Sequence, residues 1–224
     1  MTGKGADMDI SVIYADSDIA VCIKPVGVLS ENEGMPALLS AQLDKTEVHC
    51  VHRLDMAVGG VMVYALNKKA AAGLSAQIAR QAVKKEYLAI VQGQPEEKSG
   101  LMRDLLFRDK SRNKSYVVKR RRAGVKDAEL EYDCVETAGD KSLVRISLHT
   151  GRSHQIRVQF SSRRMPLVGD VKYGSVYRDC PIALWSCTLS FTHPISGRVI
   201  HFERLPAPEH YWKEFDYIKN GGIL

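Results

Sequence analysis

Residues 101–148 read LMRDLLFRDKSRNKSYVVKRRRAGVKDAELEYDCVETAGDKSLVRISL, and this stretch decides the fold class. Four runs with the composition of strands follow one another here, and only turn-like or polar segments separate them. Neighbouring parallel strands would need a crossover connection, usually a helix, and no helical pattern lies between these runs. We therefore predict four antiparallel strands at Leu101–Phe107, Ser115–Lys119, Ala128–Val135 and Leu143–Leu148.

The flanking sequence favours the same class. Further strands are predicted at Val12–Tyr14, Ile19–Lys24, Val61–Leu66, Lys84–Gln92, Ile182–Phe191 and Val199–Glu203, the last two pairing with each other. Helices are predicted at Pro36–Leu43, after a cap at Asn67, at Ser153–Ser161 and at Glu209–Tyr217. Strands outnumber helices and do not alternate regularly with them. The prediction is an α+β fold with a mainly antiparallel, mixed β-sheet and flanking helices.

The composition indicates an ordinary globular protein. The chain has 224 residues, of which 45% are hydrophobic and 26% are charged. No apolar run approaches the roughly 18 residues of a membrane span, and no secretion signal is present. The five cysteines are odd in number and form no C-x-x-C pair, which argues against a disulfide framework. We expect a cytoplasmic protein without a membrane partner, with a flexible tail over residues 1–8 and a single domain over 9–224.

The positive charge is concentrated in one stretch. Arg108–Lys126 contains nine basic residues and one acidic residue, a local charge of +8, so the remaining residues sum to −2 of the total of +6. Such a patch attracts a polyanion, of which nucleic acid is the commonest. A solvated basic loop is the alternative interpretation.

Several common site motifs are absent. The chain contains no phosphate-binding loop, no dinucleotide fingerprint and no G-x-S-x-G turn. HRLD at residues 52–55 is similar to part of a kinase catalytic loop, but the glycine-rich loop and the D-F-G segment are missing. His49, Cys50 and His52 lie close together without a second ligand pair, so we predict no metal site. These absences argue against ATP, NAD, serine-hydrolase and zinc chemistry.

Three polar residues stand in unusually apolar surroundings. Asp55 lies between VHRL and the strand that begins near residue 61, Tyr87 lies in KKEYLAIV, and Arg157 lies in GRSHQIRV. Each has an ordinary interpretation on its own: a turn-forming carboxylate, a half-buried strand tyrosine, and a surface arginine or one member of a buried ion pair. On a helix, His154 and Arg157 would share a face.

Six segments, in order, resemble the RluA family of pseudouridine synthases. They are IYADSDIAVCIKPVGVLS, HRLD with the glycine at residue 60, VKKEYLAIVQG, LHTGRSHQIRVQF, PLVGDVKYG and LSFTHPISGRVIHFE, and they extend from about Val12 to Glu203. The resemblance implies the pseudouridine synthase catalytic-domain fold. It also implies an enzyme that isomerises uridine in RNA, breaking the C–N bond between base and ribose and rejoining the base through carbon 5, with no metal or organic cofactor.

The same resemblance assigns roles to individual residues. It implies that Asp55 is the catalytic aspartate, that Tyr87 contacts the target base and that Arg157 pairs with the aspartate. Arg53 matches the position that helps to occupy the stack when the base leaves it. Unstacking costs a few kcal/mol, and stacking on an aromatic ring recovers roughly 1–3 kcal/mol. An ionised carboxylate can act as a nucleophile or as a base toward ribose, and both routes stay open.

RNA contacts are expected outside these three positions. We predict that Arg120, Arg121 and Arg122 of the basic stretch bind RNA, together with Arg152 and His154 of the GRSHQIRV segment. No separate N-terminal RNA-binding domain is expected, so RNA selection falls to the catalytic domain. The expected partner is rRNA or tRNA, and the simplest expected state is a monomer.

Two departures from the family pattern keep an alternative open. Residues 58–60 read VGG where the family usually reads Thr-Ser-Gly, and residues 184–186 read LWS where it reads Leu-His-Ala. A catalytically inactive RNA-binding relative is therefore the alternative to the enzyme. A glycoside hydrolase that uses Asp55 with Glu86 or another acid is a second alternative. It would need two carboxylates about 5–10 Å apart, and no second acid lies in a comparable motif.

Overall fold

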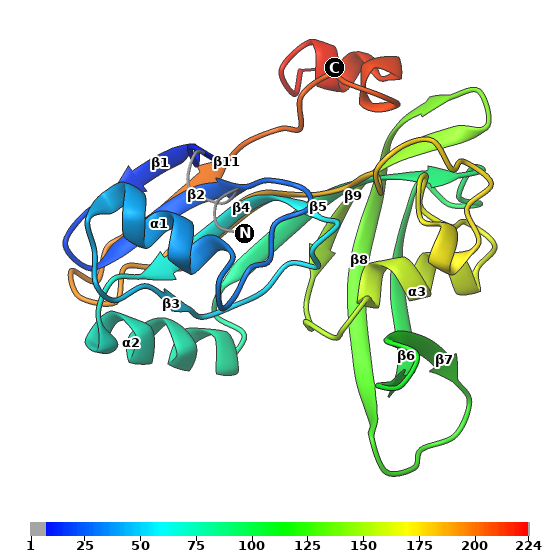
Figure 1. Ribbon diagram of the computed structural model, residues 1–224. Coiled ribbons are helices and arrows are strands. Elements are labelled where there is room, and N and C mark those ends of the chain that lie inside the picture. The colour runs from blue at the N-terminus through cyan, green and yellow to red at the C-terminus, as the bar shows by residue number, and fades with distance from the viewer. Residues whose placement is uncertain (1–7, 224) are drawn as a thin grey trace, which may run out of the picture. The chain divides into compact units, whose positions relative to one another are not determined.

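The computed structural model describes residues 8–223, which divide into two compact units (Figure 1). Unit 1 contains the chain up to Val83 together with Thr188–Arg204. Unit 2 contains Lys84–Cys187 together with the chain from Leu205 on. The flexible tail predicted for residues 1–8 lies, apart from Met8, outside the described residues.

Unit 1 is built around a β-sheet whose strands run in the order β1-β2-β4-β10, with β3 beside β4 and β11 beside β10. The pairs β1–β2, β2–β4, β3–β4 and β10–β11 are antiparallel. The elements are β1 (Val12–Ala15), β2 (Ile19–Lys24), α1 (Met35–Leu43), β3 (His49–Cys50), β4 (Gly59–Ala65), α2 (Lys68–Ala79), the second part of β10 (Leu184–Thr192) and β11 (Val199–Glu203).

Helix α2 illustrates how the local sequence sets an element of unit 1. The Asn67 side chain accepts a hydrogen bond from Ala70 N at 2.9 Å, which caps the first turn of the helix. Ala70 and Leu74, four residues apart, then lie on one side of the helix and are fully buried in the core. That core also contains alternate residues of β4, including Val61 and Val63. Capping and spacing therefore orient α2 toward the sheet.

Unit 2 contains the strands that follow one another in the order β5-β9-β8-β6-β7. The four adjacent pairs in this order are all antiparallel. The elements are β5 (Lys84–Gln92), β6 (Ser99–Asp109), β7 (Lys114–Val118), β8 (Val125–Ala138), β9 (Lys141–Leu148), α3 (Gln155–Ser162), η1 (Val171–Tyr173), the first part of β10, η2 (Trp212–Glu214) and α4 (Asp216–Lys219).

The strand register of unit 2 shows which face of its sheet α3 covers. Tyr87 of β5 pairs with Ile146 of β9, and Ile146 in turn pairs with Tyr132 of β8. Directly paired residues project to the same face of an antiparallel sheet. The ring of Tyr132 packs edge-on against Phe160 of α3, with 5.6 Å between the ring centroids. Helix α3 therefore packs on the face that carries Tyr87.

The predicted fold class and most elements are confirmed. The protein has an α+β fold with a mixed β-sheet and few flanking helices. The strands predicted at Ile19–Lys24, Lys84–Gln92 and Val199–Glu203 have the predicted bounds. The four strands predicted within residues 101–148 all form, with ends that differ from the prediction by at most three residues. The sequence also correctly predicted that β10 pairs with β11.

The helix predicted at Glu209–Tyr217 is wrong as one element. The structure has η2 and α4 instead, separated by Phe215 with φ −101° and ψ 126°. The extended backbone allows the Phe215 ring to enter the core of unit 2, where it is fully buried. Glu136 then accepts hydrogen bonds from the backbone N–H groups of Asp216 and Tyr217, both at 2.9 Å. Burial of one aromatic ring thus overrides helix continuity.

No helix within residues 8–223 is long and apolar enough to cross a bilayer.

A buried histidine joins two turns of unit 1. His193 Nδ1 accepts hydrogen bonds from the backbone N–H groups of Ile195 and Ser196, so Nε2 carries the proton and donates to Asp16 at 2.9 Å. Asp16, Asp18 and His193 also have the spacing of metal ligands. Protein hydrogen bonds already occupy both ring nitrogens, so the cluster acts as a link between the β1–β2 and β10–β11 turns.

Asp16 is the acceptor at the centre of this link. Partial burial opposes its ionisation, but hydrogen bonds from Tyr14 Oη, from the backbone N–H groups of Asp18 and Ile19, and from His193 outweigh it. The pKa of Asp16 falls from 3.8 to about 2. Because the folded state lowers this pKa, the carboxylate stabilises the fold at pH values above 3.8, and the stabilisation is lost as the pH falls through about 2.

We predict that Asp16→Asn lowers the free energy of unfolding at neutral pH by about 1.5–3 kcal/mol, the range for hydrogen bonds to charged groups. The difference from wild type should shrink as the pH falls below the ordinary pKa of an aspartate. Urea unfolding at neutral pH and at about pH 3 measures both effects. Asp9→Asn, at an exposed position, is the matched control and should leave stability unchanged. A deficit of the same size at both pH values would contradict the prediction.

Candidate active site

Asp55 lies in a loop of unit 1 that is anchored on both sides of it. On the preceding side, Ser30 Oγ donates to Leu54 O at 2.8 Å and accepts from Leu54 N at 3.0 Å. On the following side, Met56 O accepts from Gly27 N at 2.8 Å and from Lys24 Nζ at 3.3 Å. Both anchors come from the end of β2 and the segment that directly follows it. The position of the Asp55 backbone is therefore set by residues about 25–30 positions earlier in the chain.

Lys24 is the buried cation of this loop. Its side chain is fully buried, and Nζ donates to Pro25 O at 2.8 Å and Val28 O at 2.7 Å as well as to Met56 O. Burial lowers the pKa of Lys24 to about 8, and the charge of Asp55 opposes this decrease. An ammonium group with three carbonyl acceptors joins two backbone segments that have no strand pairing with each other. It also places a positive charge near Asp55.

The turn after Asp55 shows the structural effect of the VGG departure. Val58 N donates to Asp55 O at 2.9 Å, and the Val58 side chain is buried. Gly60 has φ +126°, a conformation that glycine adopts at little cost. The turn is therefore closed by a backbone hydrogen bond and a glycine conformation, neither of which needs the hydroxyl groups of the usual Thr-Ser pair.

Arg53 and His52, which precede Asp55, have different environments. Arg53 is exposed and forms an ion pair with Glu31 at 3.0 Å. His52 is buried, and its Nε2 accepts from Val63 N at 3.2 Å, which joins the HRLD segment to β4. The exposed guanidinium of Arg53 is thus in a position to contact a ligand, while His52 has a structural contact.

Arg157 in unit 2 forms a buried ion pair with Asp170. Its Nε lies 2.6 Å from Asp170 Oδ2 and its Nη2 lies 2.8 Å from Oδ1, a bidentate arrangement. The side chain of Arg157 is 7% exposed and that of Asp170 is fully buried. Of the two environments considered for Arg157 from the sequence, the structure has the buried ion pair. The carboxylate fixes the plane of the guanidinium.

Tyr173 packs beside this ion pair. The Arg157 guanidinium lies 5.1 Å from the centre of the Tyr173 ring. His154 Nδ1 lies 2.8 Å from Tyr173 Oη, and the same oxygen accepts from Ser115 N at 2.8 Å. Burial raises the pKa of Tyr173, so the hydroxyl stays protonated. Arg157 and His154 thus meet on one ring, as the shared helix face predicted, although His154 precedes α3 in a left-handed conformation.

Asp170 and Tyr173 are the residues of this site that sequence reasoning missed. Both lie in the PLVGDVKYG segment, which carried the family resemblance without roles for single residues. Gly169 before them has φ +80°, and an added Cβ would lie 2.2 Å from Pro181 O. Glycine is therefore needed there to bring Asp170 under Arg157. The signal available in the sequence was an aspartate directly after a glycine in the segment PLVGD.

Tyr87 and Glu86 project to opposite faces of β5, as neighbouring strand residues do. Tyr87 is buried on the face that α3 covers. Glu86 forms an ion pair with Arg145 at 2.8 Å, and Arg145 also donates to Tyr217 Oη at 2.6 Å. Glu86 thus belongs to a separate network of unit 2, which argues against its use as a second catalytic acid.

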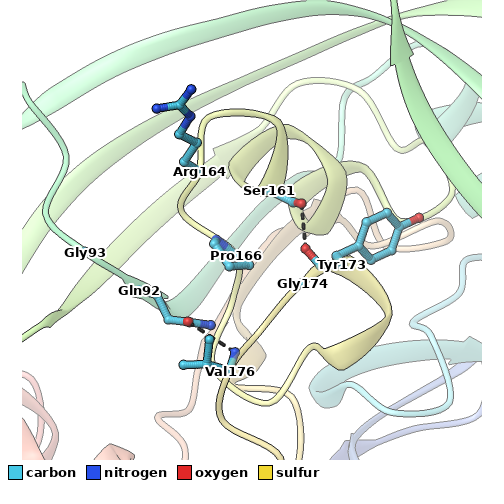
Figure 2. Close-up of a pocket in the computed structure, with 8 residues that line it drawn as sticks. All are labelled: Gln92, Gly93, Ser161, Arg164, Pro166, Tyr173, Gly174 and Val176. Atoms are coloured by element: carbon cyan, nitrogen blue, oxygen red, sulfur yellow. Dashed lines mark hydrogen bonds between the residues drawn. The ribbon is translucent and has the colours of Figure 1, made fainter.

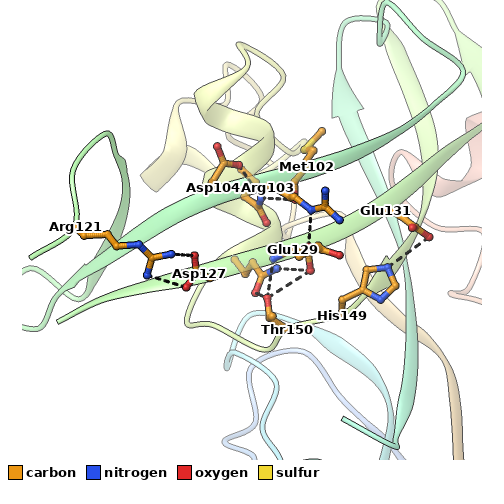
Figure 3. A network of polar contacts seen from close by, with 11 residues as sticks. Met102, Arg103, Asp104, Arg121, Asp127, Glu129, Glu131, His149 and Thr150 are labelled. Carbon is orange, nitrogen blue, oxygen red and sulfur yellow. Dashed lines mark hydrogen bonds and ion pairs between the residues drawn. The ribbon is translucent and has the colours of Figure 1, made fainter.

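The predicted RNA-binding arginines of unit 2 lie near the turn between β7 and β8. Arg120, Arg121 and Arg122 are exposed. Arg121 forms a bidentate pair with Asp127, shown in Figure 3, and the guanidinium of Arg122 lies 4.5 Å from the centre of the Phe107 ring.

Arg152, the remaining arginine predicted to bind RNA, follows β9. It donates to the backbone oxygen of Asp127 at 2.8 Å, and Asp127 also pairs with Arg121. Arg121 and Arg152 are thus brought to the same residue of β8, whereas Asp55 and Arg53 belong to unit 1.

We predict that Asp170→Ala lowers the free energy of unfolding by about 3–5 kcal/mol, because it leaves the buried guanidinium of Arg157 without this carboxylate. Urea unfolding measures the loss. Asp127→Ala, which breaks the exposed pair with Arg121, is the matched control and should cost less than about 1 kcal/mol. Equal losses in the free energy of unfolding would show that the buried Arg157–Asp170 pair matters no more for stability than the exposed Arg121–Asp127 pair.

Comparison with known proteins places this chain in one family. A family model described as RNA pseudouridylate synthase matches residues 18–162, which is more than half of the chain. RluA of Escherichia coli K12, a dual-specificity RNA pseudouridine synthase, is 36% identical over 86% of this chain and 91% of its own. YlyB of Bacillus subtilis, an uncharacterized RNA pseudouridine synthase, is 31% identical over 96% of this chain and 75% of its own.

A solved structure shows the same fold. Human RNA pseudouridylate synthase domain containing 1 superimposes with a TM-score of 0.77 at 24% sequence identity, covering 94% of this chain and 88% of the human chain. The segments matched by the family model include HRLD, KKEYLAIV and GRSHQIRV, which carry Asp55, Tyr87 and Arg157. The chain belongs to the RluA family of RNA pseudouridine synthases.

Proposed function

We propose that this protein isomerises a specific uridine of rRNA or tRNA to pseudouridine, with Asp55 as the catalytic carboxylate and the target base flipped out of its stack. The observation that carries the proposal is the anchored loop around Asp55 in a chain of this family. Ser30 holds the residue before Asp55, and Lys24 and Gly27 hold the residue after it. Such support from neighbouring hydrogen bonds is what an active-site group requires.

The chemistry assigned to Asp55 follows from its ionised form. A carboxylate can attack carbon 1 of the ribose while the base departs, or it can remove a proton from the ribose. In either route the electrons of the C–N bond leave with the base. Carbon 5 then bonds to carbon 1 of the ribose, as the carboxylate departs from carbon 1 in the first route or as the removed proton returns to the ribose in the second. Carbon 5 finally loses its hydrogen as a proton, and the former glycosidic nitrogen gains one, so the reaction is an isomerisation. The buried ammonium of Lys24, which donates to Met56 O directly after Asp55, places a positive charge near this carboxylate.

We assign Tyr87 and Arg157 to the catalytic group because they lie in family motifs and because of their surroundings in unit 2. The Tyr87 ring offers a stacking surface for the flipped base, worth roughly 1–3 kcal/mol. Arg157 supplies positive charge to the reaction centre, and its pair with Asp170 keeps the guanidinium in one orientation. The exposed Arg53 side chain would exchange its contact with Glu31 for the position left by the base.

The substrate class is proposed from the relatives and from charge. RluA of E. coli carries the name of a dual-specificity RNA pseudouridine synthase. We propose that this chain also acts on RNA, and that its RNA is a structured rRNA or tRNA. Arg120, Arg121 and Arg122, with Arg152 and His154, would contact its phosphates and sugars. Nothing in the proposed reaction calls for a metal or an organic cofactor.

The alternative is a catalytically inactive RNA-binding relative, and it rests on the VGG and LWS departures. The backbone hydrogen bond from Val58 N to Asp55 O supports the active enzyme, because it holds the turn without the missing hydroxyl. Trp185 packs against the core of unit 2, where it contributes apolar contact. The enzyme is therefore the preferred function.

We predict that wild-type protein restores pseudouridine at one or a few sites in RNA from a strain that lacks the gene, and that Asp55→Asn abolishes this activity. The amide keeps the shape of the side chain but removes its charge and its nucleophilicity. Mapping of pseudouridine across rRNA and tRNA measures the product. Retained RNA binding by Asp55→Asn is the control for folding. RNA binding by wild type without any new pseudouridine would favour the inactive relative.

We predict that a triple variant with glutamine at Arg120, Arg121 and Arg122 binds RNA more weakly and with a flatter salt dependence. Each lost phosphate contact lowers the slope of log K against log salt by roughly 0.7–0.9. Fluorescence anisotropy with unmodified tRNA at several KCl concentrations measures the slope. The control variant carries glutamine at Lys45, Lys69 and Arg80, which are exposed in unit 1. An unchanged slope in the triple variant would refute this role.

A further inference from the structure

Two adjoining cavities form a groove in unit 2 beside α3 and η1. One has a volume of about 450 Å³ and the other about 440 Å³, and both are lined by Ser161, Tyr173 and Gly174. Ser161 Oγ donates to Tyr173 O at 2.6 Å, which joins the end of α3 to η1 in the shared wall (Figure 2). Each volume falls within the roughly 300–1,000 Å³ of small-ligand sites. We call these two cavities the α3–η1 groove.

The charged side chains that line the groove are all cations. Arg164 lines the first cavity, and Lys114 and Lys172 line the second; among the residues that the structure describes, no carboxylate lines either cavity. Within residues 8–223 these three side chains form no ion pair, and Lys172 Nζ donates only to a backbone oxygen, that of Asn113, at 3.2 Å.

Other arginines of unit 2 differ in this respect. Arg103 pairs with Glu129, and Arg163, next to Arg164 in the chain, pairs with Asp104. Acidic residues of the unit thus neutralise these cations but not those of the groove. A concave surface with unneutralised positive charge attracts an anion.

The groove also offers surfaces for a base or a ribose. Tyr116 lines the second cavity and is partly exposed, with Lys114 Nζ 5.8 Å from the centre of its ring. Val171 and Val176 are 46% and 73% exposed, one in each cavity. Cations next to an aromatic ring and apolar side chains are the combination that binds single-stranded nucleic acid, because phosphates and bases then find separate partners.

Tyr173 connects the groove with the proposed catalytic group. The ring lines both cavities, and it lies 5.1 Å from the Arg157 guanidinium and 5.1 Å from Lys114 Nζ. A ligand in the groove would therefore contact the residue against which Arg157 packs. Lys114 also lies within the basic stretch of the sequence, but away from the turn that carries Arg120–Arg122.

We propose that the α3–η1 groove binds a phosphodiester segment of the RNA substrate outside the target uridine. The inference rests on the proposed function, because it assumes that RNA is the polyanion that this protein binds. Lys114, Lys172 and Arg164 contact phosphates, and Tyr116 stacks on a base. The groove is thus a second RNA contact, which lengthens the stretch of RNA that the enzyme selects.

The test compares two variants with the same change of charge. The groove variant carries glutamine at Lys114, Lys172 and Arg164, and the control variant again carries glutamine at Lys45, Lys69 and Arg80. We expect the groove variant to bind unmodified tRNA or rRNA transcripts at least about tenfold more weakly, with a salt slope lowered by roughly two or more. The control should keep the wild-type affinity and slope to within about twofold.

A second measurement does not depend on any substitution. Lysine acetylation of the wild-type protein, read by mass spectrometry, should show Lys114 and Lys172 protected when RNA is bound, while Lys45 and Lys69 stay reactive. Equal binding by the two variants, with no protection of Lys114 and Lys172, would overturn the groove while leaving the enzyme in place. RNA binding without pseudouridine formation would refute the proposed enzyme activity. The binding data would still test whether the α3–η1 groove binds RNA. Absence of RNA binding by wild type would overturn both.

Discussion

Burying an arginine is costly unless a carboxylate neutralises it and satisfies its hydrogen-bond donors, and unit 2 is arranged around this requirement. Arg157 and Asp170 form a bidentate pair with almost no exposure to water. The desolvation cost of the two charges is offset only because the geometry is good and further groups complete the surroundings. Gly169 brings the carboxylate close, and the Tyr173 ring packs on the guanidinium. A buried pair of this kind provides orientation more than stability.

Unit 1 positions Asp55 by hydrogen bonds to the loop backbone. The loop with Asp55 has no strand partner of its own, so hydrogen bonds from Ser30, Gly27 and Lys24 take the place of a sheet ladder. The Lys24 ammonium is buried and donates to the carbonyl oxygens of Pro25, Val28 and Met56. Hydrogen bonds to the backbone on either side of Asp55 hold this loop in place. Unit 2 thus holds Arg157 by an ion pair, whereas unit 1 holds the loop with Asp55 by hydrogen bonds to its backbone.

The local pattern of the sequence was sufficient for most elements. Ile19–Lys24, Lys84–Gln92 and Val199–Glu203 could be delimited because apolar, strand-forming runs end there at turn residues. Asn67 identified the start of α2 because its side chain caps the first turn. The prediction of one C-terminal helix was wrong for a reason that the local sequence pattern does not reveal. Phe215 is buried in the core of unit 2, and this burial favours an extended residue between η2 and α4 over another helical turn.

The sequence alone determined the α+β class, the family, and the residue types from which Asp55, Tyr87 and Arg157 were chosen, because these depend on short-range patterns and on ordered motifs. Tertiary structure alone decided the partners. It placed Asp170 under Arg157, Lys24 under the Asp55 loop and Glu86 against Arg145. Among residues 8–223, it also left Lys114, Lys172 and Arg164 without an ion pair, although the full chain contains 26 acidic residues. The physical reason is that charge neutralisation and burial depend on distances across the fold, which the order of residues along the chain does not specify.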